Sequence, residues 1–136
     1  MDALRRALPL LLVVAVAGAA CEDGPQASEA EVDEFRAAVD GLCQAASFLG
    51  QRQVPEAVRV FQNRTHQYLH QLIARVEPLD RAASSDLLEA KHAMEIALPD
   101  PTFYGEKEVG RRLEELHQAL LRAGAVVGLP EVGCGA

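Results

Sequence analysis

Two histidines, His66 and His70, are the residues of this sequence whose spacing best suits chemistry, because they lie four positions apart. Side chains at that spacing are neighbours on one face of a helix, and imidazole is a good ligand for Zn²⁺ and Cu²⁺. Two ligands do not complete a site, so a third donor is needed, from His117 or a nearby carboxylate. The alternative interpretation is a pair of structural histidines on the solvated shoulder of a helix.

Other chemical motifs are incomplete. The sequence contains no G-x-S-x-G elbow, no glycine-rich phosphate loop and no H-E-x-x-H. Short Glu/His spacings of a kind found in metal sites occur at Glu89/His92, Glu114/His117 and His92/Glu95. None of them is joined by the further inward carboxylates that a di-metal bundle requires. A formal net charge of −7 without a basic face argues against nucleic-acid binding. We therefore expect a protein that is not an enzyme and has no nucleic-acid partner.

The elements that must position the histidines are helices. Apolar residues recur at spacings of three and four, and no segment alternates with period two for long enough to form a strand. Ser28 and Glu31 form a capping box, Pro55 suits a first helical turn and Asp80 is a candidate N-cap. Residues 99–101 form a break, and an internal loop is expected to continue from it to Gly105. The sequence therefore predicts helices over about 29–49, 54–76, 81–98 and 106–123.

Four helices with short connections predict an all-α domain over 28–136, an up-down-up-down four-helix bundle. Gly124 is expected to end the fourth helix, and the irregular tail 125–136 is expected to fold back along the bundle. On the second helix, His66 falls at the edge of the predicted buried face and His70 lies further towards solvent. That buried face is predicted to contain Val58, Phe61, Thr65, Leu69, Leu72 and Val76.

The first twenty residues have the layout of an export signal. Arg5 and Arg6 precede an apolar run, Ala7–Ala17, which is followed by the small residues 18–20. The run is shorter than the roughly 20 apolar residues of a permanent membrane span. We expect residues 1–20 to be removed and the rest of the chain to be exported.

Cys21 directly follows these small residues, and Ala19-Ala20-Cys21 resembles the end of the lipobox in bacterial lipoprotein signals. Gly18 departs from that pattern, in which Leu, Val or Ile is usual. The resemblance implies that Cys21 is acylated, that residues 21–27 form a polar tether, and that the protein is anchored to the outer face of a bacterial membrane. Ordinary cleavage after Ala20, giving a secreted or periplasmic soluble protein, remains the alternative.

The chain has three cysteines. If Cys21 carries lipid, Cys43 and Cys134 remain, and an oxidising compartment allows them to pair. Cys43 lies roughly 20 Å along the first helix, and about ten extended tail residues reach roughly 33 Å. We predict a Cys43–Cys134 disulfide, with two separate buried thiols as the alternative.

Together these features predict a non-enzymatic lipoprotein of the bacterial cell envelope, which acts as a binding or accessory protein. Its partners would be the membrane, through Cys21, and an envelope protein. The alternative function is a Cu or Zn carrier or sensor on the periplasmic side that uses His66 and His70, with His117 as a possible third ligand. No other cofactor is expected.

Overall fold

The computed structural model describes residues 26–135, which fold into helices joined by short turns. No strand occurs among these residues, so the predicted all-helical class is confirmed. The predicted export segment 1–20 and Cys21 lie outside the described residues. The helices are α1 (Glu29–Gly50), α2 (Val54–Val60), the π-helix η1 (Phe61–His66), α3 (Gln67–Val76), α4 (Arg81–Ala97), α5 (Pro101–Tyr104) and α6 (Glu106–Val126).

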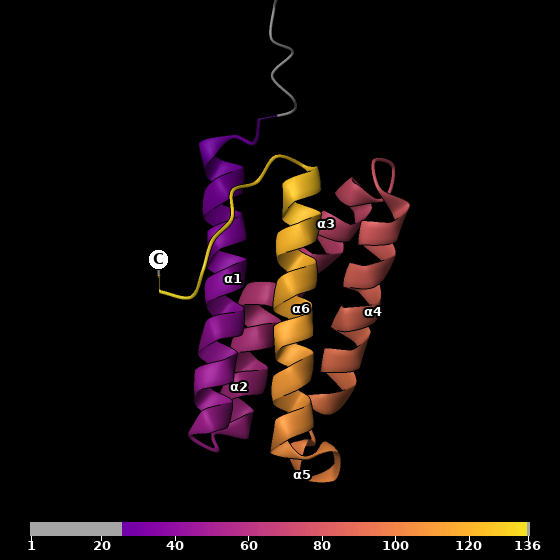
Figure 1. Cartoon of the computed structure of the whole chain (residues 1–136). Helices are drawn as coiled ribbons and strands as arrows, with labels where there is room; N and C mark the ends of the chain where they lie inside the picture. The colour runs from indigo at the N-terminus through magenta and orange to yellow at the C-terminus, as the bar shows by residue number, and fades with distance from the viewer. Residues whose placement is uncertain (1–25, 136) are drawn as a thin grey trace, which may run out of the picture.

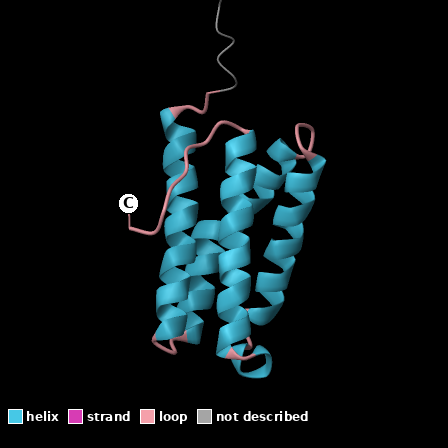
Figure 2. Cartoon of the chain, viewed as in Figure 1, coloured by secondary structure: helices cyan, strands magenta, loops and turns pink. Residues whose placement is uncertain are grey.

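The long helices lie side by side (Figure 1). α2, η1 and α3 follow one another without a loop and form one rod, which contacts α1 through α2 and η1 and contacts α4 through α3. α6 packs against both α4 and α1. After α6 the chain leaves the helices and runs back beside α1 (Figure 2). Each seam between two neighbouring rods is therefore a place where side chains distant in sequence can meet.

Local capping sets several helix ends where the sequence predicts them. The Ser28 hydroxyl accepts a hydrogen bond from the Glu31 backbone N–H, and the Glu31 carboxylate accepts one from the Ser28 backbone N–H at 2.8 Å. The Asp80 carboxylate caps α4 by accepting from Ala83 N–H at 3.0 Å. Asp100 caps the single turn α5 in the same way, in a segment predicted to be a loop. Side chains that satisfy first-turn N–H groups thus fix where α1, α4 and α5 begin.

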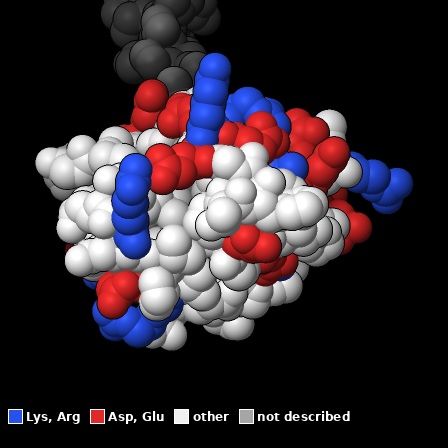
Figure 3. All heavy atoms as spheres, turned by 90° about the horizontal axis from the view of Figure 1, so that it is seen from below, with Lys and Arg blue, Asp and Glu red and all other residues white. Residues whose placement is uncertain are grey.

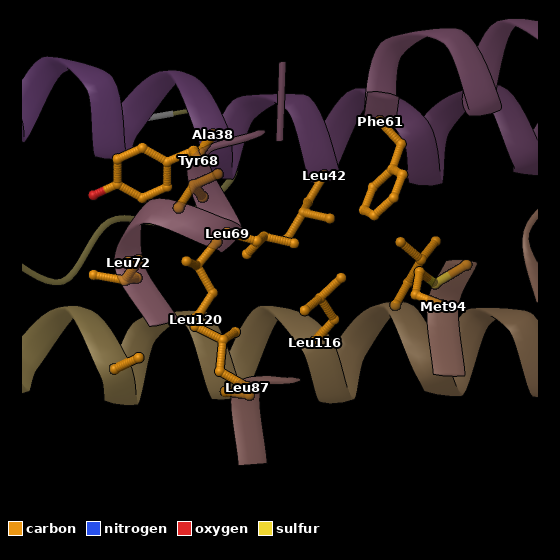
Figure 4. Packing of buried hydrophobic residues seen from close by; sticks show 14 of the residues in the cluster. Ala38, Leu42, Phe61, Tyr68, Leu69, Leu72, Leu87, Met94, Leu116 and Leu120 are labelled. Atoms are coloured by element: carbon orange, nitrogen blue, oxygen red, sulfur yellow. The ribbon is translucent and has the colours of Figure 1, made fainter. Parts of the chain in front are cut away.

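Buried apolar side chains from every long helix meet in one cluster (Figure 4). Each fully buried Leu or Met side chain contributes roughly 1.5–3 kcal/mol relative to an exposed one. Leucine is the most frequent residue of this cluster, and aromatic residues are only 4% of the sequence. The labelled members are Ala38 and Leu42 of α1, Phe61 of η1, Tyr68, Leu69 and Leu72 of α3, Leu87 and Met94 of α4, and Leu116 and Leu120 of α6.

The predicted end of α6 is wrong. The helix continues past Ala123 to Val126, so Gly124 lies inside it and is buried. A Cβ atom at Gly124 would lie 2.8 Å from Cζ of Phe35, a buried residue of α1. The glycine is therefore required by the close approach of an aromatic ring from the neighbouring helix, and not by a helix-ending turn. The positive φ of 78° after the helix belongs to Gly128.

Cys43 of α1 and Cys134 of the tail form a disulfide, with 5.6 Å between their Cα atoms. This is the pairing predicted from the sequence. Three tail side chains between α6 and the bridge, Val127, Leu129 and Val132, are buried. The bridge and these contacts hold the tail against the helices, and the bridge joins residues separated by 91 positions.

We predict opposite effects for two glycine substitutions in α6. Gly124→Ala should lower the free energy of unfolding by about 1–3 kcal/mol, because the added methyl group overpacks the Phe35 ring. Gly110→Ala should raise it by up to about 1 kcal/mol, because alanine favours the helix and a Cβ there meets nothing within 4 Å. Urea unfolding followed by circular dichroism measures both. Equal effects of the two substitutions would contradict the packing role of Gly124.

We predict that reducing the disulfide lowers the free energy of unfolding by about 4–5 kcal/mol in the chain-entropy model for a loop of this length. Urea unfolding with and without reductant measures the difference. A Cys43→Ser/Cys134→Ser variant is the control, since reductant should leave its stability unchanged. Free reaction of both thiols with an alkylating reagent in the unreduced exported protein would contradict the bridge.

Candidate metal site

Three potential metal ligands, His66, His70 and Glu95, meet on the seam between the α2–η1–α3 rod and α4. One donor atom from each lies within 4.8 Å of the others. Nε2 of His66 is 3.3 Å from Nε2 of His70 and 2.6 Å from Oε1 of Glu95. Within residues 26–135, this is the group of His, Cys, Asp and Glu side chains with the spacing to hold a metal ion.

The cluster lies at the molecular surface. The side chains of His66 and Glu95 are 28% and 23% exposed, and His70 is exposed. The two imidazole rings pack edge to face with centroids 4.7 Å apart. His66 also lies beside the buried Phe61, at a ring-centroid distance of 6.3 Å. The position of His66 at the edge of the core and of His70 nearer to solvent agrees with the sequence-based expectation.

The wide turn η1 aligns the buried face of α2 with that of α3. Ala57, Phe61, Thr65 and Leu69 are all fully buried, although they are spaced by three successive steps of four residues. Such steps rotate by about 120° in total around an ideal α-helix. A π-helical turn, closed by i→i+5 hydrogen bonds, contains more residues and removes this drift. The turn keeps these four side chains on one buried face. His66 directly follows the buried Thr65 and therefore lies beside that face.

The same turn shifts the buried face of α2 from the predicted register. Val58 was predicted to point inward but is only partly buried, whereas Ala57 and Val60 are buried. The prediction assumed an unbroken α-helix from 54 to 76, and the extra residue in η1 changes the alignment of everything before it. The other predicted inward positions of this rod are confirmed, namely Phe61, Thr65, Leu69, Leu72 and Val76.

Close contact with α1 holds the wide turn in place. The Thr65 hydroxyl is fully buried and donates a hydrogen bond to the Ala38 carbonyl at 2.9 Å. Gly41 faces the same turn, and a Cβ there would lie 2.9 Å from Cβ of Arg64 and closer still to the Thr65 hydroxyl. The absence of a side chain at Gly41 therefore allows η1 to approach α1 closely enough for the Thr65 bond to form.

A buried lysine adjoins the cluster. Lys91 of α4 is only 2% exposed, and its Nζ lies 2.8 Å from the same Glu95 oxygen that faces His66. Burial by itself disfavours the ionised form of Glu95. The hydrogen bond and charge of Lys91, together with His66, outweigh that effect and lower the pKa of Glu95 below its usual value. Glu95 is therefore a carboxylate at neutral pH, as a metal ligand must be.

The pKa of His70 is lower than that of a free histidine side chain. Partial removal of water from its ring is the largest cause, although the residue as a whole is exposed, and the nearby charge of Lys91 acts in the same direction. A lowered pKa favours the neutral imidazole. His70 is therefore available to coordinate a metal ion at neutral pH.

His117 does not belong to this cluster, so its prediction as a third ligand is wrong. It lies on the α6 face turned towards α1, where it lines a groove of about 750 Å³ together with Leu42, Leu113 and the Cys43–Cys134 bridge. Its Nε2 atom is buried and has no hydrogen-bond partner among the described residues. The seam between α1 and α6 therefore holds His117, and the seam between the α2–η1–α3 rod and α4 holds His66 and His70.

Sequence reasoning allowed for a nearby carboxylate as the third ligand but did not identify Glu95, and it missed Lys91. The sequence feature that could have identified them is their spacing. Lys91 and Glu95 are four positions apart, as His66 and His70 are. Two such pairs can face each other only if α3 and α4 are adjacent and in the right register. His92, which also has a metal-motif spacing to Glu95, is exposed.

Basic side chains elsewhere on the surface lie among acidic ones. Arg111 and Arg112 both bond the Glu108 carboxylate, at 2.6 and 2.9 Å, and these bonds lower the pKa of Glu108 to about 2. Arg52 lies 3.6 Å from Glu106. On the face that contains α5, blue and red side chains lie near one another between broad uncharged areas (Figure 3). Lys91 differs from these basic residues because it is buried.

Comparison with family models, curated proteins and solved structures finds no match for this chain. Among residues 26–135, no helix combines the length and the apolar composition needed to cross a bilayer. The geometry of the cluster is therefore the basis for a functional assignment.

Proposed function

We propose that this protein is a non-enzymatic carrier or sensor of a divalent copper or zinc ion, which it binds through His66, His70 and Glu95. The observation that carries the proposal is the meeting of these three donors within 4.8 Å, contributed by two separate stretches of the chain. Two imidazoles and one carboxylate are a donor set that suits both ions.

The position of the cluster favours reversible binding over a structural role. Structural zinc sites are closed by four protein ligands, whereas three protein ligands leave one position open. His70 is exposed, so an ion can enter and leave without opening the core. The core itself is built from apolar side chains and reinforced by a disulfide, which means that the fold does not need a metal ion to hold it together.

We place this site in an exported lipoprotein. The scaffold we propose is an up-down-up-down four-helix bundle made of α1, the α2–η1–α3 rod, α4 and α6, with the C-terminal tail folded back along it. The disulfide supports export to an oxidising compartment, and Cys21 would attach the chain to the outer face of a bacterial membrane. An envelope protein that receives or supplies the ion would be the partner. A soluble periplasmic or secreted form remains the alternative.

We predict that the protein binds about one equivalent of Cu²⁺ or Zn²⁺ and that a His66→Ala/His70→Ala variant binds at least about 100-fold more weakly. Loss of a supporting group near a metal typically costs 10–100-fold in affinity, and loss of two direct ligands should cost at least as much. Isothermal titration with each ion measures the affinities. Binding should weaken as pH falls through the imidazole range, because protonated histidines do not coordinate.

Two further variants locate the site. Glu95→Gln should weaken binding, because the amide lacks the charge of the carboxylate. His117→Ala is the matched control and should bind as the wild type does, since His117 lies on another seam. Equal, weak binding by the wild type and the His66→Ala/His70→Ala variant would rule out the proposed site.

We predict that the protein purified from a bacterial host carries lipid on Cys21 and fractionates with membranes. A Cys21→Ser variant should lose the lipid mass and the membrane association, because no thiol remains to be acylated. Intact mass spectrometry and cell fractionation measure both properties. Cys43→Ser is the control and should stay lipidated. A wild-type protein that begins at Cys21 without lipid and remains in the soluble fraction would support ordinary secretion instead.

A further inference from the structure

We propose that the metal ion binds together with a small anion, which is held between the open coordination position of the ion and the ammonium group of Lys91. This inference rests on the proposed function, because it needs an ion at His66, His70 and Glu95. It assigns a role to the one strongly buried charged side chain of the described residues.

Lys91 has hydrogen-bonding capacity beyond its contact with Glu95. An ammonium group carries three N–H donors and no acceptor. Within residues 26–135, the Glu95 carboxylate is the partner that the structure gives it, at 2.8 Å. Lysine is almost never fully buried unless its charge is paired. The remaining donors of Lys91 therefore favour a second acceptor, and an anion is the acceptor that an ammonium group binds most strongly.

The charge balance of the cluster points the same way. Without a metal ion, the positive charge of Lys91 balances the negative charge of Glu95. The other groups that act on the charge of Glu95, His66 and His92, are basic. A divalent ion would leave the cluster with an excess of two positive charges in a partly buried place, where charges interact more strongly than in water. A bound anion reduces this excess.

The distances allow one anion to contact both the ion and Lys91. Nζ lies 2.8 Å from Oε1 of Glu95, and a carboxylate oxygen bonds zinc at about 2.0–2.2 Å. The ammonium group is therefore at most about 5 Å from an ion held by that oxygen. An anion with one atom bonded to the ion and accepting a hydrogen bond from Lys91 Nζ would fit between the ion and the ammonium group. Small oxyanions and linear anions such as azide have the required charge and can contact a metal ion and an ammonium group at the same time.

A purely structural lysine would behave differently. If Lys91 only neutralises Glu95, an anion can still bind at the open position of the ion, but its affinity should not depend on Lys91. If Lys91 also binds the anion, the anion tightens metal binding and the metal tightens anion binding by the same factor, and removing Lys91 weakens this coupling. Measuring the two affinities in the wild type and in a Lys91 variant distinguishes the roles.

The test uses Co²⁺ as a spectroscopic substitute for zinc and azide as the anion. We expect azide to shift the visible spectrum of the Co²⁺-loaded wild type and to tighten Co²⁺ binding at least about tenfold. In a Lys91→Met variant, we expect azide affinity to fall at least about tenfold, while Co²⁺ without azide binds more tightly because a nearby positive charge is gone. Lys107→Met, at an exposed lysine of α6, is the matched control and should match the wild type.

Three results would overturn the inference in distinguishable ways. If the wild type binds Co²⁺ with the same affinity with and without azide, the anion site is rejected and the metal site stands; this arm needs no variant and is independent of whether Lys91→Met folds. Unchanged azide affinity in Lys91→Met or Lys91→Gln, with Co²⁺ still bound, would likewise reject the role of Lys91. Failure of the wild type to bind Co²⁺ at all would reject both the inference and the proposed function.

Discussion

The packing of the wide turn η1 against α1 holds in place the rod that carries His66 and His70. Thr65 reaches the Ala38 carbonyl only because Gly41 presents no side chain to it. The wide turn keeps residues at every fourth position, Ala57 to Leu69, on one buried face. In a regular α-helix these side chains would rotate progressively out of the core. The residue after Thr65, His66, lies at the edge of the core, where it meets Glu95 of α4. Without the wide turn, Ala57 and Phe61 could not lie on the same buried face as Thr65 and Leu69.

A single carboxylate oxygen of Glu95 links His66, on the rod, to Lys91, on α4. Oε1 of Glu95 is approached both by His66 and by the ammonium group of Lys91. The two pairs, one on each side of the seam, are each spaced by four residues, so each presents two neighbouring side chains to the other. Burial of Lys91 makes the charge balance of the cluster sensitive to any added ion, because little water is present to screen it.

Features written in local sequence could be predicted, whereas those set by contact between helices could not. The capping box at Ser28, the Asp80 cap and the helical periodicity are local signals, and the cysteine count together with chain reach identified the Cys43–Cys134 pair. Gly124 was misread because a glycine near a helix end is commonly a cap, while its actual reason is the Phe35 ring of another helix. Glu95 required knowledge of how α4 is aligned with α3.

The separation of the bridge from the cluster bears on how an ion could be exchanged. The disulfide and the buried tail stabilise the seam between α1 and α6, whereas the cluster lies beside α4 on another seam. The cluster and the bridge share no residue, so ion exchange at the proposed site does not require the bridge to open. A fold that is stable without metal can release its ion and remain folded, which is what a carrier or sensor requires. A structural site would instead couple metal loss to unfolding.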